Sequence, residues 1–175
     1  MDEVRRARKV LFAAVSIGWS ASAMPASPAT QVHSFHLDAP LSSVFPLFTA
    51  LGERSWAPGW EPLILSGEQE RGSAFLTRDK SGRQTTWIVT EYQPKEGRVS
   101  YARLAHDSNI GLVDVICTEA ASGGTDVSVR YTLTGVSEQG RDFVREFLDA
   151  DRYAEMIEEW QSATRAALAK PAASR

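Results

Sequence analysis

The chain has 175 residues, of which 43% are hydrophobic and 23% are charged, as expected of one ordinary globular domain. The net charge of −3 argues against a nucleic-acid partner, because phosphate binding requires a basic surface. The single cysteine, Cys117, excludes an internal disulfide.

The first 23 residues have the pattern of an export signal. Residues 5–9 (RRARK) are basic, residues 10–19 are apolar, and residues 21–23 (ASA) fit a small-x-small cleavage site. The apolar run is too short to span a bilayer, so we expect no stable membrane span in the mature protein. We expect a periplasmic or secreted protein. The alternative is a cytoplasmic protein with a misassigned start, because the two early acidic residues are unusual in a signal.

The rest of the chain reads as one domain. We expect a flexible Ala/Pro/Ser leader at residues 24–30, a domain at residues 31–170 and a short tail at residues 171–175.

The domain begins with a strand and continues mainly in strand patterns. Alternating residues predict a first strand at residues 31–37, followed by a helix that Pro46 divides into two short pieces. A loop with two tryptophans, Trp56 and Trp60, comes next, either to plug the end of a sheet or to rim a cavity. The pattern of period two then predicts six further strands, at residues 63–65, 73–78, 85–92, 98–104, 110–119 and 125–134. Turn residues separate them, which indicates an antiparallel meander with one apolar and one polar face.

Residues 137–170 predict one long terminal helix. Apolar residues recur there at spacings of three and four, Ser137 can cap the start, and Pro171 prevents continuation. About thirty residues at 1.5 Å each make a rod of roughly 45 Å. A rod of that length with one apolar face requires an equally long apolar partner, and the sheet is the candidate.

This order of elements resembles the SRPBCC or START-like helix-grip superfamily, which includes lipid-transfer proteins and aromatic polyketide cyclases. The resemblance covers about residues 31–170. It is carried by the strand-to-helix stretch Leu37-Asp38-Ala39-Pro40, by Val44-Phe45, by Glu53-x-x-Trp56-x-Pro58-Gly59-Trp60, and by Tyr153, Ile157 and Trp160 on the final helix. It implies an α+β fold in which a curved antiparallel sheet of about seven strands wraps around the long C-terminal helix. It also implies a cavity between sheet and helix that holds a hydrophobic molecule.

The sequence shows no metal-binding or cofactor-binding pattern. Of its three histidines, His33 and His36 lie three apart on a predicted strand and therefore point to opposite faces, and His106 lies in a turn. No paired C-x-x-C, H-E-x-x-H or calcium-loop spacing occurs. We therefore expect no metal and no cofactor.

Polar residues on the strands around residues 94–97 are candidates for chemistry. A hairpin of simple register there predicts three cross-strand pairs, namely Trp87 with Arg103, Val89 with Tyr101, and Glu91 with Val99. These paired residues share one side of the sheet. If that side is concave, Glu91 and Arg103 are polar groups in an apolar hollow, able to orient a ligand carboxylate or act as acid and base. If it is the solvated side, Trp87 and Arg103 form a surface cation–π pair. A slip of one residue would exchange the faces.

These patterns leave three functions open. The first is an exported protein that binds or carries a hydrophobic small molecule or lipid, with expected lining residues Trp87, Val89, Tyr101, Val115, Val127, Val129, Tyr131, Phe143, Phe147 and Ile157. The second is an enzyme resembling the polyketide cyclases, with Glu91, Arg103 or Tyr131 as its acid/base group. The third is an interaction module with a solid interior. Binding without catalysis is the expectation we favour, and no pattern predicts an oligomeric state.

Overall fold

A computed structural model describes residues 27–67 and 69–170. The expected export signal at residues 1–23, part of the leader and the C-terminal tail therefore lie outside the described residues.

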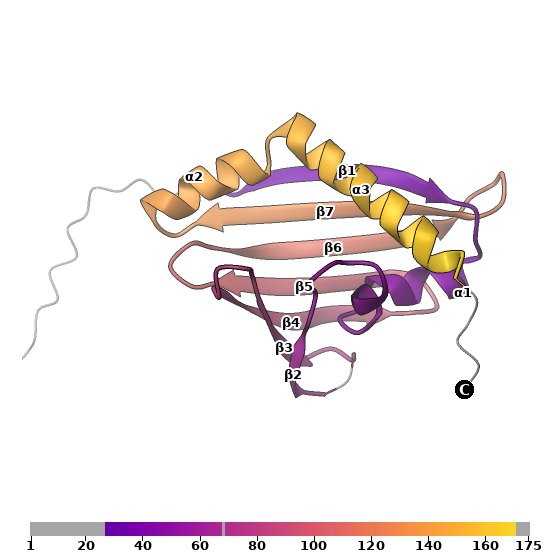
Figure 1. The fold of residues 1–175 in the computed structure, drawn as a ribbon, viewed down its shortest axis with the longest axis horizontal. Coiled ribbons are helices and arrows are strands. Elements are labelled where there is room, and N and C mark those ends of the chain that lie inside the picture. The colour runs from indigo at the N-terminus through magenta and orange to yellow at the C-terminus, as the bar shows by residue number, and fades with distance from the viewer. Residues whose placement is uncertain (1–26, 68, 171–175) are drawn as a thin grey trace, which may run out of the picture.

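Seven antiparallel strands form one sheet in the described part of the chain (Figure 1). Its order is β1-β7-β6-β5-β4-β3-β2, so the first strand pairs with the last and the others follow as a meander. The strands are β1 Ala29–Leu37, β2 Leu63–Ser66, β3 Ala74–Arg78, β4 Gln84–Gln93, β5 Arg98–Ala105, β6 Asn109–Glu119 and β7 Thr125–Gly135. The expected meander of about seven strands is confirmed.

Strand alternation places the core on one face of the sheet. In β7 every second side chain from Thr125 onward is buried, including Val127 and Val129, while Asp126 and Arg130 on the opposite face are exposed. A strand directs successive side chains to opposite faces, so the buried set marks the concave face. The two C-terminal helices lie over that face (Figure 1).

The C-terminal segment forms two helices instead of the one expected. They are α2 Glu138–Phe147 and α3 Ala150–Leu168. The break comes at Leu148, which is buried, and at Asp149, whose ψ of 134° is extended and whose carboxylate accepts a hydrogen bond from the Arg152 amide. The long C-terminal helix is confirmed as α3, but the expectation that residues 137–170 form a single rod is wrong. The break lets α2 pack on β7 while α3 crosses toward β1, which a straight rod on a curved sheet could not do.

The connection between β1 and β2 is built from three short helical pieces. They are α1 Leu41–Val44, η1 Phe45–Phe48 and η2 Gly52–Ser55. Pro46 occupies the first turn of η1, so it divides the helix as expected. A Cβ at Gly52 would lie 1.8 Å from the Pro46 carbonyl oxygen, so only glycine allows η2 to pack this closely on η1.

The β4–β5 hairpin follows the expected register only in part. Trp87 pairs with Arg103 and Val89 with Tyr101, as expected, but the register shifts between Val89 and Glu91. Because a bulge adds one residue to β4, Glu91 pairs with Ser100 on the outer face. Its carboxylate there lies 3.5 Å from the Arg98 guanidinium.

The expected Glu91–Val99 pair is therefore wrong, and Glu91 does not reach the concave side. Tyr92 takes the position opposite Val99, and its ring packs 5.8 Å from that of Phe45.

Candidate functional site

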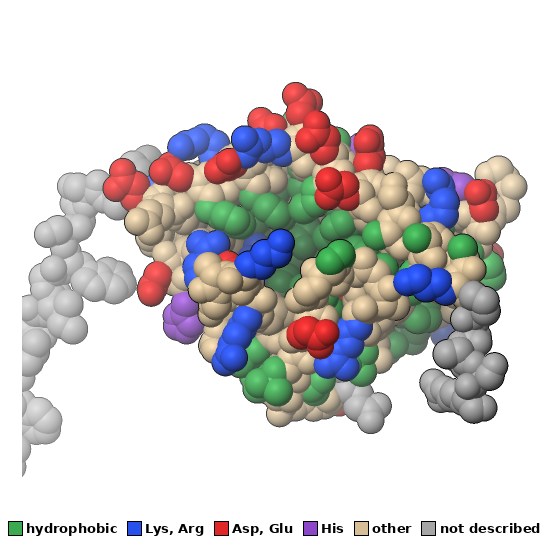
Figure 2. Space-filling view, in the orientation of Figure 1, with side chains coloured by type: hydrophobic (Ala, Val, Ile, Leu, Met, Phe, Trp, Pro, Cys, Tyr) green, Lys and Arg blue, Asp and Glu red, His purple; other side chains and the backbone are tan. Residues whose placement is uncertain are grey.

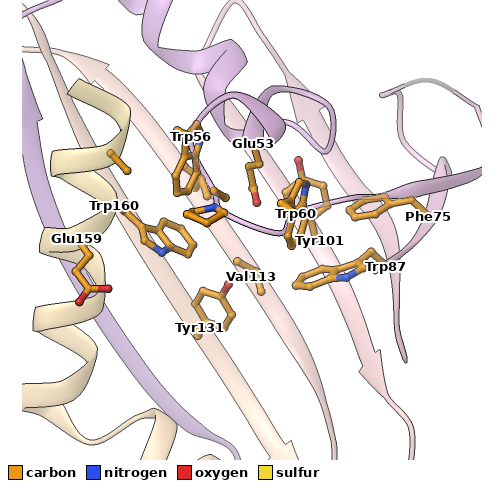
Figure 3. A pocket seen from close by; sticks show the side chains of 14 residues that line it. Glu53, Trp56, Trp60, Phe75, Trp87, Tyr101, Val113, Tyr131, Glu159 and Trp160 are labelled. Atoms are coloured by element: carbon orange, nitrogen blue, oxygen red, sulfur yellow. The ribbon is translucent and has the colours of Figure 1, made fainter. Parts of the chain in front are cut away.

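A cavity of about 420 Å³ lies between the sheet, the segment of residues 53–60 and α3. Figure 2 shows hydrophobic side chains in the hollow below the helices, with charged side chains around it. The segment contributes Glu53, Trp56, Ala57, Pro58 and Trp60 to the lining. The strands contribute Phe75, Trp87, Tyr101, Val113, Val115 and Tyr131, and α3 contributes Glu159, Trp160 and Ala163 (Figure 3).

Four tryptophan rings line the cavity, and hydrogen bonds hold three of them in place. The indole N–H of Trp56 donates to the Leu47 carbonyl at 2.7 Å, and that of Trp60 donates to the Ala50 carbonyl at 2.8 Å. The Trp87 indole donates to Thr77 Oγ1 at 2.9 Å. These bonds satisfy the buried N–H groups and orient the rings, so the wall is largely preformed.

Ring contacts join the segment to both the sheet and the helix. The Trp56 and Trp160 centroids lie 5.2 Å apart, which connects the segment to α3. Trp60 meets Trp87 edge-on at 5.7 Å. The two tryptophans whose role the sequence left open therefore both line the cavity.

Glu53 is the polar group that the sequence reasoning missed. Its side chain extends from η2 into the cavity (Figure 3). Burial raises the pKa of its carboxyl to about 8, from an ordinary value of 4.5. Among the described residues, no hydrogen bond or ion pair reaches this carboxyl. The available signal was its place in the Trp/Pro/Gly loop that carries part of the family resemblance.

Two tyrosine hydroxyls in the lining differ in their surroundings. The Tyr101 hydroxyl donates to the Phe48 carbonyl oxygen at 2.9 Å. The Tyr131 hydroxyl has no hydrogen-bond partner within residues 27–67 and 69–170, so it is free to bond a ligand. Burial raises the pKa of both groups above their ordinary range, so both stay protonated at neutral pH.

Arg103 lies on the concave side, beside the cavity lining. Its guanidinium carbon is 5.4 Å from the centroid of the Trp87 ring, so the cation–π pair exists, but on the concave rather than the solvated face. Burial lowers the pKa of Arg103, and its Nε has no hydrogen-bond partner in the described structure.

The expected lining residues divide into two groups. Trp87, Tyr101, Val115 and Tyr131 line the cavity. The others lie elsewhere, with Val89, Val127, Val129 and Ile157 in the packed core and Phe143 and Phe147 on a separate shallow depression at α2. The reason is the helix break: α2 lies on the sheet, and Phe147 packs against Tyr131 at 5.3 Å and against Tyr153 at 6.4 Å. Side chains therefore fill that end of the concave face.

Among the residues described, no three His, Cys, Asp or Glu side chains converge as metal ligands. His36 lies between Asp126 at 2.8 Å and Asp38 at 3.2 Å, both exposed.

No helix of the described chain has the length and apolarity needed to cross a membrane.

A seven-stranded antiparallel sheet packs against a C-terminal helix and leaves an apolar cavity between them. This arrangement defines a helix-grip protein. The chain belongs to the polyketide cyclase/dehydrase and lipid transport family, whose model matches residues 28–170. The resemblance drawn from the sequence is thereby confirmed. No curated protein matches the chain.

Solved structures share the fold at low sequence identity. Norcoclaurine synthase from Thalictrum flavum is 9% identical, with a TM-score of 0.61 over 94% of this chain and 100% of that one. Major latex-like protein 151 from Panax ginseng is 9% identical, with a TM-score of 0.60 over 80% and 97%. An uncharacterized protein from Rhizobium leguminosarum is 17% identical, with a TM-score of 0.59 over 82% and 95%. At such identities the similarity shows the fold alone.

Proposed function

We propose that the protein binds a hydrophobic small molecule or lipid in the cavity and acts as a carrier or sequestering protein. The observation that carries the proposal is the apolar cavity of about 420 Å³ with preformed aromatic walls. That volume is within the range of small-molecule sites. A ligand that buried roughly 250 Å² of apolar surface would gain about 6 kcal/mol from desolvation, before the entropic cost of binding. The family's description, which includes lipid transport, supports the proposal.

The experiment has two parts. Mass spectrometry of an organic extract of the purified protein identifies any ligand that copurifies. Titration with the neutral dye N-phenyl-1-naphthylamine then measures occupancy of the cavity by fluorescence. We expect saturable binding of one dye molecule per chain.

A matched pair of variants on α3 places the binding in the cavity. Ala163 lines it, whereas Ala166 is exposed on the same helix. We expect Ala163→Phe to fill the space and weaken dye binding at least tenfold, and Ala166→Phe to leave it unchanged. Equal effects of the two substitutions would contradict the proposal.

Glu53 favours a second candidate, an acid/base enzyme related to the polyketide cyclases. A carboxyl with a pKa of about 8 can both donate and accept a proton near neutral pH. In that function the cavity would hold a reactive carbonyl-containing chain, and Glu53 with the Tyr131 hydroxyl would transfer the proton. Of the earlier candidates, Glu91 points away and Arg103 lies beside the lining. Glu53→Gln should then abolish turnover while dye binding persists.

We also propose that the protein is exported through residues 1–23. The support is the basic, apolar and small-residue pattern of that stretch. Cell fractionation with N-terminal sequencing of the mature protein checks it. A full-length chain in the cytoplasm would contradict it.

A further inference from the structure

The charged residues that line the cavity are all of one sign. Two of the lining side chains are carboxylates, Glu53 and Glu159, and none of the described lining residues is Lys, Arg or His. Arg103 lies nearby, but it is engaged with the Trp87 ring. A site for a ligand carboxylate or phosphate would need a cation or several free N–H donors in the lining. The charged groups of this lining are carboxylates, which repel such a ligand.

The aromatic residues of the lining also favour a positive charge in the cavity. Seven lining residues are aromatic, and they include four of the five tryptophans in the chain. The faces of such rings carry negative potential and attract cations, tryptophan most strongly. Arg103 already demonstrates this, since its guanidinium lies 5.4 Å from the centroid of the Trp87 ring.

We propose that the ligand carries a positively charged nitrogen, as a protonated amine or quaternary ammonium, held by the Glu53 carboxylate against the tryptophan rings. This inference rests on the proposed binding function and narrows the chemical class of its ligand. A hydrophobic body on the same molecule would occupy the apolar part of the cavity lined by Val113 and Val115.

A neutral ligand does not need an ionised carboxylate in the lining. The free Tyr131 hydroxyl is enough to bond one carbonyl oxygen of a neutral molecule. In the empty cavity a proton neutralises the Glu53 carboxyl, because burial raises its pKa to about 8. A ligand cation replaces that proton as the neutralising charge. The titratable groups that interact with Glu53 are Tyr101 and Tyr131, with Arg103 beside Tyr131, and Glu159 lines the cavity from an exposed position on α3. None of those in the lining supplies a positive charge.

The test uses two probes of equal shape that differ in charge. Phenyltrimethylammonium and tert-butylbenzene compete separately for bound N-phenyl-1-naphthylamine at pH 8.5, where the Glu53 carboxyl is mostly ionised. We expect the cation to bind at least tenfold more tightly than its neutral isostere. The substitution Glu53→Gln should reduce that ratio to below about threefold while dye binding persists, which shows that the cavity is intact.

A matched control separates the cavity charge from the overall charge of the protein. Glu158→Gln removes the same charge from α3 at an exposed position that does not line the cavity, and it should leave the ratio unchanged. The affinity for phenyltrimethylammonium, which does not titrate, should also rise by nearly tenfold per pH unit between pH 6 and 7.5 and level off above pH 8. Glu53→Gln should remove this rise.

The outcomes distinguish the two proposals. Equal affinity for the two probes, or a preference that survives Glu53→Gln, would overturn the cationic ligand and leave the binding function in place. Failure of the dye and both probes to bind would overturn both.

Discussion

The hydroxyl of Tyr101, in the middle of β5, donates a hydrogen bond to the carbonyl oxygen of Phe48 at the end of η1. The distance is 2.9 Å, and both side chains are buried. This bond connects the sheet to the segment that carries Glu53 and Trp56 into the cavity.

Removing the Tyr101 hydroxyl should therefore destabilise the protein. We expect Tyr101→Phe to lower the free energy of unfolding by about 1–2 kcal/mol, because the Phe48 carbonyl loses its buried partner. Tyr131→Phe is the matched control, since its hydroxyl has no protein partner in the described structure, and it should change stability by less than about 0.5 kcal/mol. Urea denaturation measures both. Equal losses would show that the Tyr101 bond adds no net stability.

The half-buried Glu53 carboxyl, whose pKa is raised in the folded protein, predicts a stability that depends on pH. Its pKa is about 8 in the folded protein against an ordinary 4.5, so below pH 4.5 both states are protonated and the shift costs nothing. Between pH 4.5 and 8 the unfolded state releases a proton that the folded state retains, so stability falls as pH rises, and above pH 8 the loss is complete. Glu53→Gln avoids this loss.

We therefore expect Glu53→Gln to stabilise the protein by roughly 2–4 kcal/mol at pH 8.5 and by much less at pH 5. Chemical denaturation at the two pH values measures the difference. Glu158→Gln, an exposed change on α3, should have little effect at either pH. A benefit of Glu53→Gln that is the same at both values would show that burial does not shift this carboxyl.

Arg103 is half-buried, at a cost that its ring contact offsets only in part. Its cation–π contact with Trp87 contributes about 0.5–2 kcal/mol, whereas the desolvated guanidinium keeps a buried Nε without a partner. We expect Arg103→Met to retain the packing and raise the free energy of unfolding by about 1 kcal/mol. Arg98→Met, on the exposed outer face of the same strand, should stay within about 0.5 kcal/mol of the parent. A loss of stability in Arg103→Met would mean that the guanidinium anchors the concave face.

Each C-terminal helix depends on its own cap. Asp149 accepts from the Arg152 amide at 3.3 Å, and Ser137 accepts from the Gly140 amide at 3.0 Å while its hydroxyl donates to the Asp107 carbonyl at 2.6 Å. Asp149→Ala should cost about 1 kcal/mol, and Ser137→Ala somewhat more, because it breaks two bonds.

Thermal or urea unfolding measures both cap variants. Ser162→Ala, at an exposed position within α3, is the control and should be neutral or slightly stabilising. A neutral Asp149→Ala would indicate that the packing of Leu148, and not the cap, sets the break between the helices.

Local pattern was enough to predict most of the architecture. Strand alternation, the proline in the first helix and the apolar face of the last segment each depend on residues a few positions apart, and these placed the seven strands and the helical segments. Alternation also placed Val115 and Tyr131 on the apolar face, and it put Trp87 and Tyr101 on one shared face without deciding whether that face is concave. All four line the cavity.

Three features were decided only by the tertiary structure. The bulge after Val89 turned Glu91 outward, and the break at Leu148 and Asp149 laid α2 across one end of the sheet and filled it. Burial of Glu53 depends on the packing of η2 over strands that lie far along the chain. A sequence pattern reports which face a residue occupies within its own element. Register, helix direction and desolvation depend on contacts between elements, and only the assembled fold determines them.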